Sequence, residues 1–179
     1  MLSRHPYEPF PNVESRNVLQ ECVEVPAVVR SLKLPVGARV LEVGCGRGIA
    51  LPPLSQLCRP SRLVGLDIDE ELLAAARSRA DERGIDVELV RGDVRALPFA
   101  DRSFDVVVDF GTCYHVGHAE RALSEIARVL DHGGRFVHET PLSQRLAHPV
   151  RSRGRLPWRS EPRLCRDRTA VLWSSRRAL

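Results

Sequence analysis

Three features that would assign the chain to a membrane, secreted or zinc-binding class are missing from its 179 residues. No run approaches the roughly 18 apolar residues that a membrane-spanning helix needs, and the N-terminus MLSRHPYEPF lacks the basic start and apolar centre of a signal peptide. The five cysteines are odd in number and form no CxxC pair, which argues against a disulfide framework and a zinc knuckle. We therefore expect a soluble, cytoplasmic protein with reduced thiols, no membrane partner and no metal.

Lysine is nearly absent, since Lys33 is the only one, and arginine carries the rest of the basic charge. Residues 141–179 hold ten arginines against Glu161 and Asp167, a local net charge of +8, whereas the residues before them hold 17 basic and 21 acidic side chains, a net charge of −4. A basic tail can bind phosphates or acidic partners, but this one lacks interleaved aromatic side chains. Nucleic acid is consequently a less favoured partner.

Apolar strands and amphipathic helices alternate along residues 36–140. The expected strands cover 39–43, 62–69, 87–90, 104–110 and 133–139, and the expected helices cover 47–57, 70–84 and 118–130. A helical segment, 13–32, precedes them, with Pro26 as a kink or restart. Strands that alternate with helices form βαβ units, so we expect an α/β fold with a doubly wound, Rossmann-like sheet and a ligand site at the carboxyl ends of its strands.

Beyond Thr140 the alternation stops. Residues 141–160 are rich in proline and arginine, and residues 170–174 form the better of two short extended segments that follow. We expect these segments to make an antiparallel hairpin at the edge of the sheet. The expected organisation is a single domain over residues 1–179, with a helical lead-in (1–35), a cofactor-binding core (36–140) and a basic tail with the terminal hairpin (141–179).

Three glycines at alternate positions follow the first strand in VLEVGCGRG, residues 40–48. A dinucleotide-binding loop has the spacing GxGxxG and binds a pyrophosphate at a helix N-terminus, but here the spacing is Gly44, Gly46, Gly48, with Glu42 just before it. A carboxylate beside the loop would repel a pyrophosphate and attract a cation. The loop therefore favours a ligand such as an amino acid with its α-amino group, and the alternative is a plain turn from strand to helix.

Two further acids end or follow the next strands. Asp67 lies 19 residues after Gly48, close to the offset of about 20 at which a carboxylate binds ribose hydroxyls, whereas Asp69 is placed to cap the following helix. Asp93 follows the third strand, where its carboxylate can accept from the exocyclic amine of a purine while the N–H of Val94 addresses a ring nitrogen. The alternative for Asp93 is an ordinary turn aspartate.

The segments VLEVGCGRG, VGLDID, RGDVRALPFADRSFDVVV and IARVLDHGGRFV together resemble the class I S-adenosylmethionine-dependent methyltransferases in order and spacing, over residues 36–139. The resemblance implies a sheet of about seven strands, five of them parallel and followed by an antiparallel hairpin, with S-adenosylmethionine bound across the strand ends and S-adenosylhomocysteine as product. It implies cofactor contacts from Glu42, Gly44, Cys45 and Gly46 at the methionine moiety, Asp67 at the ribose with Ile68 beside it, Asp93 and Val94 at the adenine, and Asp109 and Phe110 beside the sulfonium.

Methyl transfer from a sulfonium is an in-line displacement, so the protein must align the acceptor, exclude water and, for a hydroxyl acceptor, remove a proton. The segment DFGTCYHVGHAER offers His115 as a general base and Tyr114 as part of the acceptor pocket, and Glu139 at the end of the fifth strand is a second substrate-binding candidate. The alternatives are a solvated loop histidine and an edge acid. A metal site at Cys113, His115 and His118 is disfavoured because a fourth ligand is missing.

The short acceptor region favours a small-molecule acceptor, or one held partly by another subunit, as in a homodimer. We therefore predict a methyltransferase that uses S-adenosylmethionine to methylate a small molecule. Two alternatives are an RNA or protein methyltransferase that uses the basic C-terminal segment, and a non-catalytic S-adenosylmethionine-binding partner protein.

Overall fold

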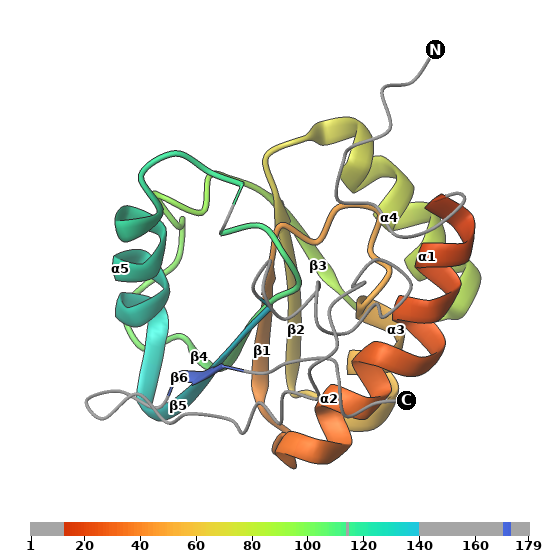
Figure 1. Cartoon of the computed structure of the whole chain (residues 1–179), viewed down its shortest axis with the longest axis horizontal. Helices are drawn as coiled ribbons and strands as arrows, with labels where there is room; N and C mark the ends of the chain where they lie inside the picture. Colours follow the sequence, from red (N-terminus) through yellow and green to blue (C-terminus); the bar gives the residue numbers. More distant parts are fainter. Residues whose placement is uncertain (1–12, 114, 140–169, 173–179) are drawn as a thin grey trace, which may run out of the picture.

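The computed structural model describes residues 13–113, 115–139 and 170–172. Within them, six parallel strands form one sheet in the order β3-β2-β1-β4-β5-β6, with helices on both faces (Figure 1). The strands are β1 (Arg39–Val43), β2 (Arg62–Asp67), β3 (Glu88–Arg91), β4 (Phe104–Asp109), β5 (Leu130–His138) and β6 (Ala170–Leu172). The helices are α1 (Val13–Leu19), the π-helical turn η1 (Gln20–Glu24), α2 (Val25–Leu32), α3 (Leu51–Cys58), α4 (Glu70–Arg83) and α5 (Ala119–Val129).

The strand order reverses between β1 and β4. The chain builds outward from β1 through β2 to β3, and then returns to the other side of β1 to build β4, β5 and β6. In open parallel sheets, ligands bind at the carboxyl ends of the strands that border such a reversal. The ends of β1 and β4, at Val43 and Asp109, therefore mark the crevice expected from the sequence.

Two hydrophobic clusters bury the two faces of the sheet. On one face, Val40 of β1 lies in a cluster with Leu54 of α3 and residues of α2, and on the other face, Leu41 lies in a cluster with Ile126 of α5. Parallel strands that are covered on both faces are apolar along most of their length. Figure 1 shows this arrangement, with α5 on one side of the sheet and the other helices on the opposite side.

The helix boundaries follow local signals that the sequence contains. The Asp69 carboxylate accepts hydrogen bonds from the backbone N–H groups of Glu71 and Leu72, which confirms the expected N-cap of α4. Gly84, with φ of 60°, ends the same helix in the left-handed conformation. Pro26 lies in the first turn of α2, directly after η1, and the backbone stays helical from η1 into α2, so the helix changes its hydrogen-bonding pattern near this proline without a break.

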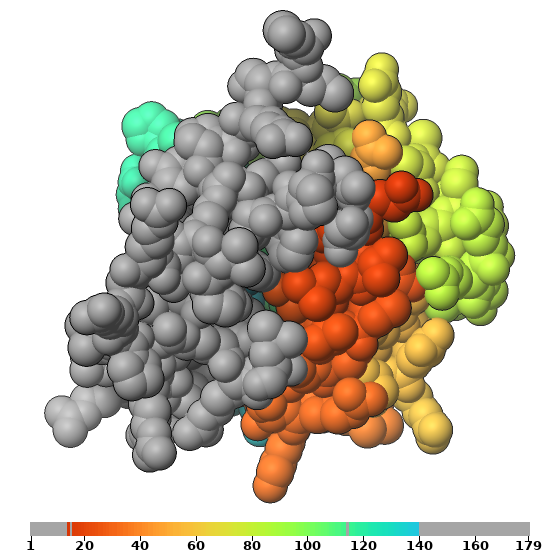
Figure 2. Space-filling model, turned by 45° about the vertical axis from the view of Figure 1, so that its right-hand side comes forward, coloured from red at the N-terminus to blue at the C-terminus, as the bar shows by residue number. Residues whose placement is uncertain are grey.

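The N-terminal helices pack beside α4. On the face shown in Figure 2, α1 and α2 form a red-to-orange band next to the yellow-green residues of α4. Glu21 of η1 connects the two segments, because its carboxylate lies 2.7 Å from a guanidinium nitrogen of Arg79 and 2.7 Å from one of Arg83. These ion pairs connect the helical lead-in to α4.

The expected antiparallel hairpin is wrong for the one part of it that the structure describes. β6 lies at the sheet edge as expected, but it pairs parallel to β5, with Val171 opposite Val137. The chain between His138 and Ala170 exceeds the dozen or so residues that a parallel crossover requires, so a parallel pairing of β6 with β5 is possible. The remainder of the hairpin, the basic tail and residues 1–12 lie outside the described residues.

Candidate functional site

The first glycine of the loop after β1, Gly44, lets the loop after β4 pack closely against it. A Cβ atom at Gly44, where φ is 66°, would overlap the hydroxyl of Thr112 and lie 2.6 Å from its Cβ. The Thr112 hydroxyl donates a hydrogen bond of 3.4 Å to the Gly44 carbonyl oxygen. By contrast, a Cβ at Gly46 would meet nothing within 4 Å among the described residues. Gly44 thus joins the loops after β1 and β4, and Gly46 borders open space.

Asp67 braces the glycine loop from the end of β2. Its buried carboxylate accepts hydrogen bonds from the backbone N–H of Gly46 at 2.7 Å and from that of Asp69 at 2.9 Å. Each carboxylate oxygen can accept more than one hydrogen bond, so these contacts leave acceptor capacity on Asp67. The structure therefore brings Asp67 to the glycine loop, at the edge of the sheet where the sequence places the ribose.

Glu42 is a buried acid, and one oxygen of its carboxylate lacks a hydrogen-bond partner in the described part of the chain. Its residue is 3% exposed, and its Oε2 atom is buried without a hydrogen-bond partner among the described residues. Burial, followed by the nearby carboxylates of Asp109 and Asp67, raises the pKa of Glu42 well above its ordinary value. A cation beside Glu42 would offset both the desolvation and the repulsion.

Asp109 lies at the end of β4 and is fully buried. Its two oxygens accept hydrogen bonds from the backbone N–H groups of Gly111, Thr112 and Cys113 and from Nδ1 of His138, at 2.5 to 3.1 Å. Burial alone would raise the pKa of Asp109, but the hydrogen bonds from His138 and Cys113 outweigh it and lower that pKa. Asp109 thus anchors the loop after β4, whereas the resemblance implied a contact beside the sulfonium.

The residues expected at the adenine make different contacts. Arg95 donates to the Asp93 carboxylate from Nη2 at 2.6 Å and from its backbone N–H at 2.8 Å, and this pairing lowers the pKa of Asp93. Val94 is buried, whereas Ile68 at the end of β2 is 60% exposed. Asp93 is thus already paired with Arg95, and Ile68 exposes an apolar side chain just after β2.

The acceptor candidates come from the loop after β4 and from the end of β5. His115 is exposed on the loop after β4, and Glu139 is buried, with its backbone N–H donating to the Asp109 carbonyl oxygen at 2.9 Å. Tyr114 lies outside the described residues. Phe110 is half-buried and packs on the cluster that contains Val40 and Leu54, which places the ring against the core.

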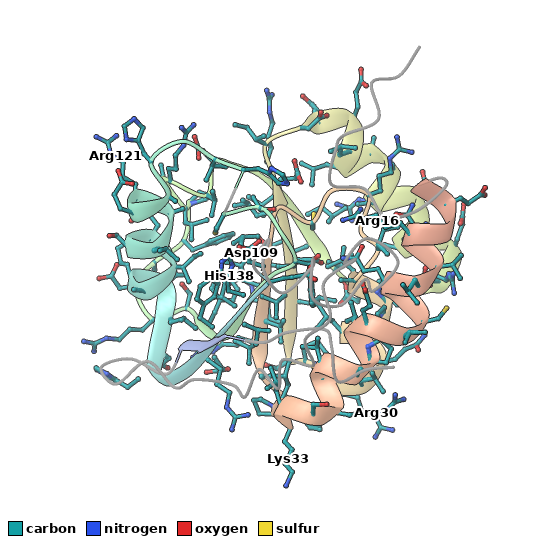
Figure 3. The ribbon with its side chains drawn as sticks, in the orientation of Figure 1. Arg16, Arg30, Lys33, Asp109, Arg121 and His138 are labelled. Carbon is teal, nitrogen blue, oxygen red and sulfur yellow. The ribbon has the colours of Figure 1, made fainter. Side chains whose placement is uncertain are left out.

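His138 is a site residue that the sequence analysis missed. It lies at the carboxyl end of β5 beside Asp109, as Figure 3 shows at the labelled pair. The available signal was its position, since it ends a strand of a parallel sheet, but only the register between β4 and β5 shows which side chain it faces.

Three further properties of the described residues bear on the site and on the class of protein. None of their His, Cys, Asp and Glu side chains group as a metal site would require. None of the helices in this part of the chain is long and apolar enough to cross a membrane. Burial and the nearby acids Glu42 and Asp67 raise the pKa of the Cys45 thiol, which keeps it neutral in the glycine loop.

Comparison with known proteins gives one family. A family model described as a methyltransferase domain matches residues 41–138. The chain is 38% identical over 102 residues to a fatty-acid O-methyltransferase of Mycolicibacterium smegmatis, covering 57% of this chain and 36% of that protein. It is 42% identical over 103 residues to a phosphatidylethanolamine N-methyltransferase of Cereibacter sphaeroides, covering 56% and 49%.

A solved structure, the YcgJ protein of Bacillus subtilis, is similar with a TM-score of 0.60 at 28% identity, covering 71% of this chain and 59% of that one. The segment matched by the family model runs from Leu41 within β1 to the end of β5 and contains every acid of the site except Glu139. The chain spans only about a third to a half of the length of the two enzymes it matches.

Proposed function

Because the chain belongs to the methyltransferase-domain family, whose cofactor is S-adenosylmethionine, we propose that it transfers a methyl group from this cofactor to a small-molecule acceptor. The observation that carries the proposal is the buried Oε2 of Glu42 in β1, which has no hydrogen-bond partner among the described residues and precedes the glycine loop in which Gly46 borders open space. S-adenosylmethionine has a cationic α-amino group and a cationic sulfonium, and it supplies an electrophilic methyl group when bound. The residues present fit this group.

The described residues suggest a division of roles. We assign Glu42 and the open backbone at Gly46 to the methionine moiety, Asp67 to the ribose hydroxyls, and Ile68 with Asp93 to the adenine. In this assignment, Asp109 acts indirectly, because its buried carboxylate holds the loop that packs on Gly44. The chain's own part in the chemistry is to bind, orient and exclude water, which for methyl transfer is the main contribution a protein makes.

For the acceptor we propose a small lipid-like molecule. The matched relatives are named for a fatty acid and for phosphatidylethanolamine, and both names describe lipids. The acceptor contacts would come from the segment after β4, with His115 and Tyr114, and from Glu139 after β5. A second subunit, as in a homodimer, would supply further contacts.

A transfer assay with labelled cofactor tests the proposal. The purified chain is incubated with methyl-labelled S-adenosylmethionine and, separately, with oleate, 1-dodecanol, phosphatidylethanolamine vesicles and total RNA. We expect label in a lipid product and S-adenosylhomocysteine in equal amount. Label in RNA alone would replace the small-molecule acceptor by a nucleic acid, and no S-adenosylhomocysteine with any acceptor would contradict an active transferase.

A further inference from the structure

A carboxylate and an imidazole form a buried pair at the carboxyl ends of β4 and β5. Asp109 and His138 are register partners in adjacent parallel strands, so their side chains point to the same face of the sheet. Nδ1 of His138 lies 2.7 Å from Oδ2 of Asp109 (Figure 3). The His138 ring also stacks on Phe136 of the same strand, with 5.5 Å between the ring centroids. Two neighbours therefore hold the imidazole in one orientation.

The pair also determines which ring nitrogen carries the proton. The pKa of Asp109 is lowered, so its carboxylate is ionised and can only accept hydrogen bonds. Nδ1 of His138 must consequently be the donor, and in the neutral ring the lone pair lies on Nε2. Among the described residues, the only recorded partner of this ring through a hydrogen bond is Asp109. The side chain is 14% exposed, so part of the ring reaches the surface.

The pair is connected to the glycine loop through one loop of the chain. The same Asp109 carboxylate that accepts from His138 also accepts from the backbone of Thr112 and Cys113. Thr112 in turn packs on Gly44. His138 thus lies on the ligand edge of the sheet and is held by the carboxylate that positions the loop beside the cofactor site.

We propose that Nε2 of His138 is the general base of the reaction and that the acceptor is a hydroxyl group, an inference that rests on the proposed function. As the acceptor oxygen forms a bond to the methyl carbon, the bond from that carbon to sulfur breaks and its electron pair stays on sulfur. Nε2 takes the hydroxyl proton and later releases it to water, while Asp109 stabilises the imidazolium. A hydroxyl needs this help at neutral pH, whereas a carboxylate acceptor has no proton to lose.

The variants separate this role from a structural one. His138→Asn keeps a nitrogen donor near the position of Nδ1, so the hydrogen bond to Asp109 can persist, but it has no base. His132→Asn is the matched control, because His132 is exposed at the other end of β5. His115→Asn tests the competing base from the loop after β4.

The first experiment needs no acceptor. The folded chain is treated with diethyl pyrocarbonate, which modifies unprotonated imidazole nitrogens, and the modified peptides are mapped by mass spectrometry with and without S-adenosylhomocysteine. We expect His138 to react, and to react more slowly with S-adenosylhomocysteine bound, while the exposed His132 reacts equally in both. The inference is overturned, whether or not an acceptor is found, if His138 does not react or if S-adenosylhomocysteine leaves its rate of modification unchanged.

The second experiment measures turnover of the hydroxyl probes 1-dodecanol and phenol, with oleate as the carboxylate probe. His138→Asn should bind S-adenosylhomocysteine with unchanged affinity but lose about 100- to 10,000-fold in hydroxyl methylation. Hydroxyl methylation that His138→Asn leaves intact overturns the inference, and so does an unmutated chain that methylates oleate but neither hydroxyl probe. In either case the proposed function still stands, whereas it fails separately if the unmutated chain binds no S-adenosylhomocysteine.

Discussion

At the scale of single residues, the acids of the site differ in their hydrogen-bond partners. Asp67 accepts from two backbone N–H groups and Asp109 from three together with His138, whereas Oε2 of Glu42 has no partner in the described part of the chain. A buried polar atom without a partner costs about 1–3 kcal/mol, and more when it is charged. Glu42 is therefore the residue whose energy depends most on a bound cation.

This difference predicts how Glu42 affects stability as pH changes. Its pKa is raised by burial, so between the ordinary glutamate value of about 4.3 and the raised value the folded chain binds more protons than the unfolded chain. The free energy of unfolding should consequently fall as pH rises through that interval. Glu42→Gln should flatten this decline, and urea unfolding at a series of pH values measures it.

The exposed Glu82→Gln variant on α4 is the matched control and should keep the decline of the unmutated protein. Affinity for S-adenosylmethionine should rise with pH over the same interval, because a cation favours the ionised carboxylate. The Glu42→Gln variant should bind S-adenosylmethionine more weakly, and its affinity should not rise with pH over this interval. An identical pH dependence in Glu42→Gln and the unmutated protein would show that Glu42 does not titrate in this way.

At the scale of elements, the sequence predicted the features that depend on neighbouring residues in the chain. Strands β1 to β5, the N-cap at Asp69 and the end of α4 at Gly84 agree with expectation, since periodicity and capping are properties of neighbouring residues. The direction of β6 was not predicted correctly, because it depends on the path of a long connection. The contact of His138 with Asp109, 29 residues away in the chain, depends on the register of two strands, which the sequence does not specify.

The contact of Gly44 with Thr112 is a second long-range feature, and it predicts a rescue between two loops. Gly44→Ala should destabilise the fold by about 2–4 kcal/mol, because the new Cβ overlaps Thr112 and φ is positive. Thr112→Gly in that background removes the three Thr112 side-chain atoms nearest the new Cβ and should restore part of the loss. Thermal or urea unfolding of the two single variants and the double variant measures the coupling. Strictly additive effects would show that the two loops do not touch as described.

At the scale of the whole molecule, the two ends of the sheet differ in how their acids are neutralised. At the amino end, the guanidinium of Arg39 lies 2.6 Å from Asp105 and 2.7 Å from Asp131, which ties together the starts of β1, β4 and β5. At the carboxyl end, Glu42, Asp67 and Asp109 gather at the strand reversal without an arginine bound to them among the described residues. The fold therefore concentrates acidic side chains where a cationic cofactor is expected to bind.

The most direct test of this account is titration calorimetry of S-adenosylhomocysteine into the unmutated chain and two variants. We expect saturable binding of one molecule per chain, weakened about 10- to 100-fold in Asp67→Ala, which removes a buried acceptor from the ribose and the glycine loop. The exposed Asp81→Ala variant on α4 should bind as the unmutated chain does. If the folded, unmutated chain shows no binding of S-adenosylhomocysteine, the assignment of this site to the cofactor is contradicted.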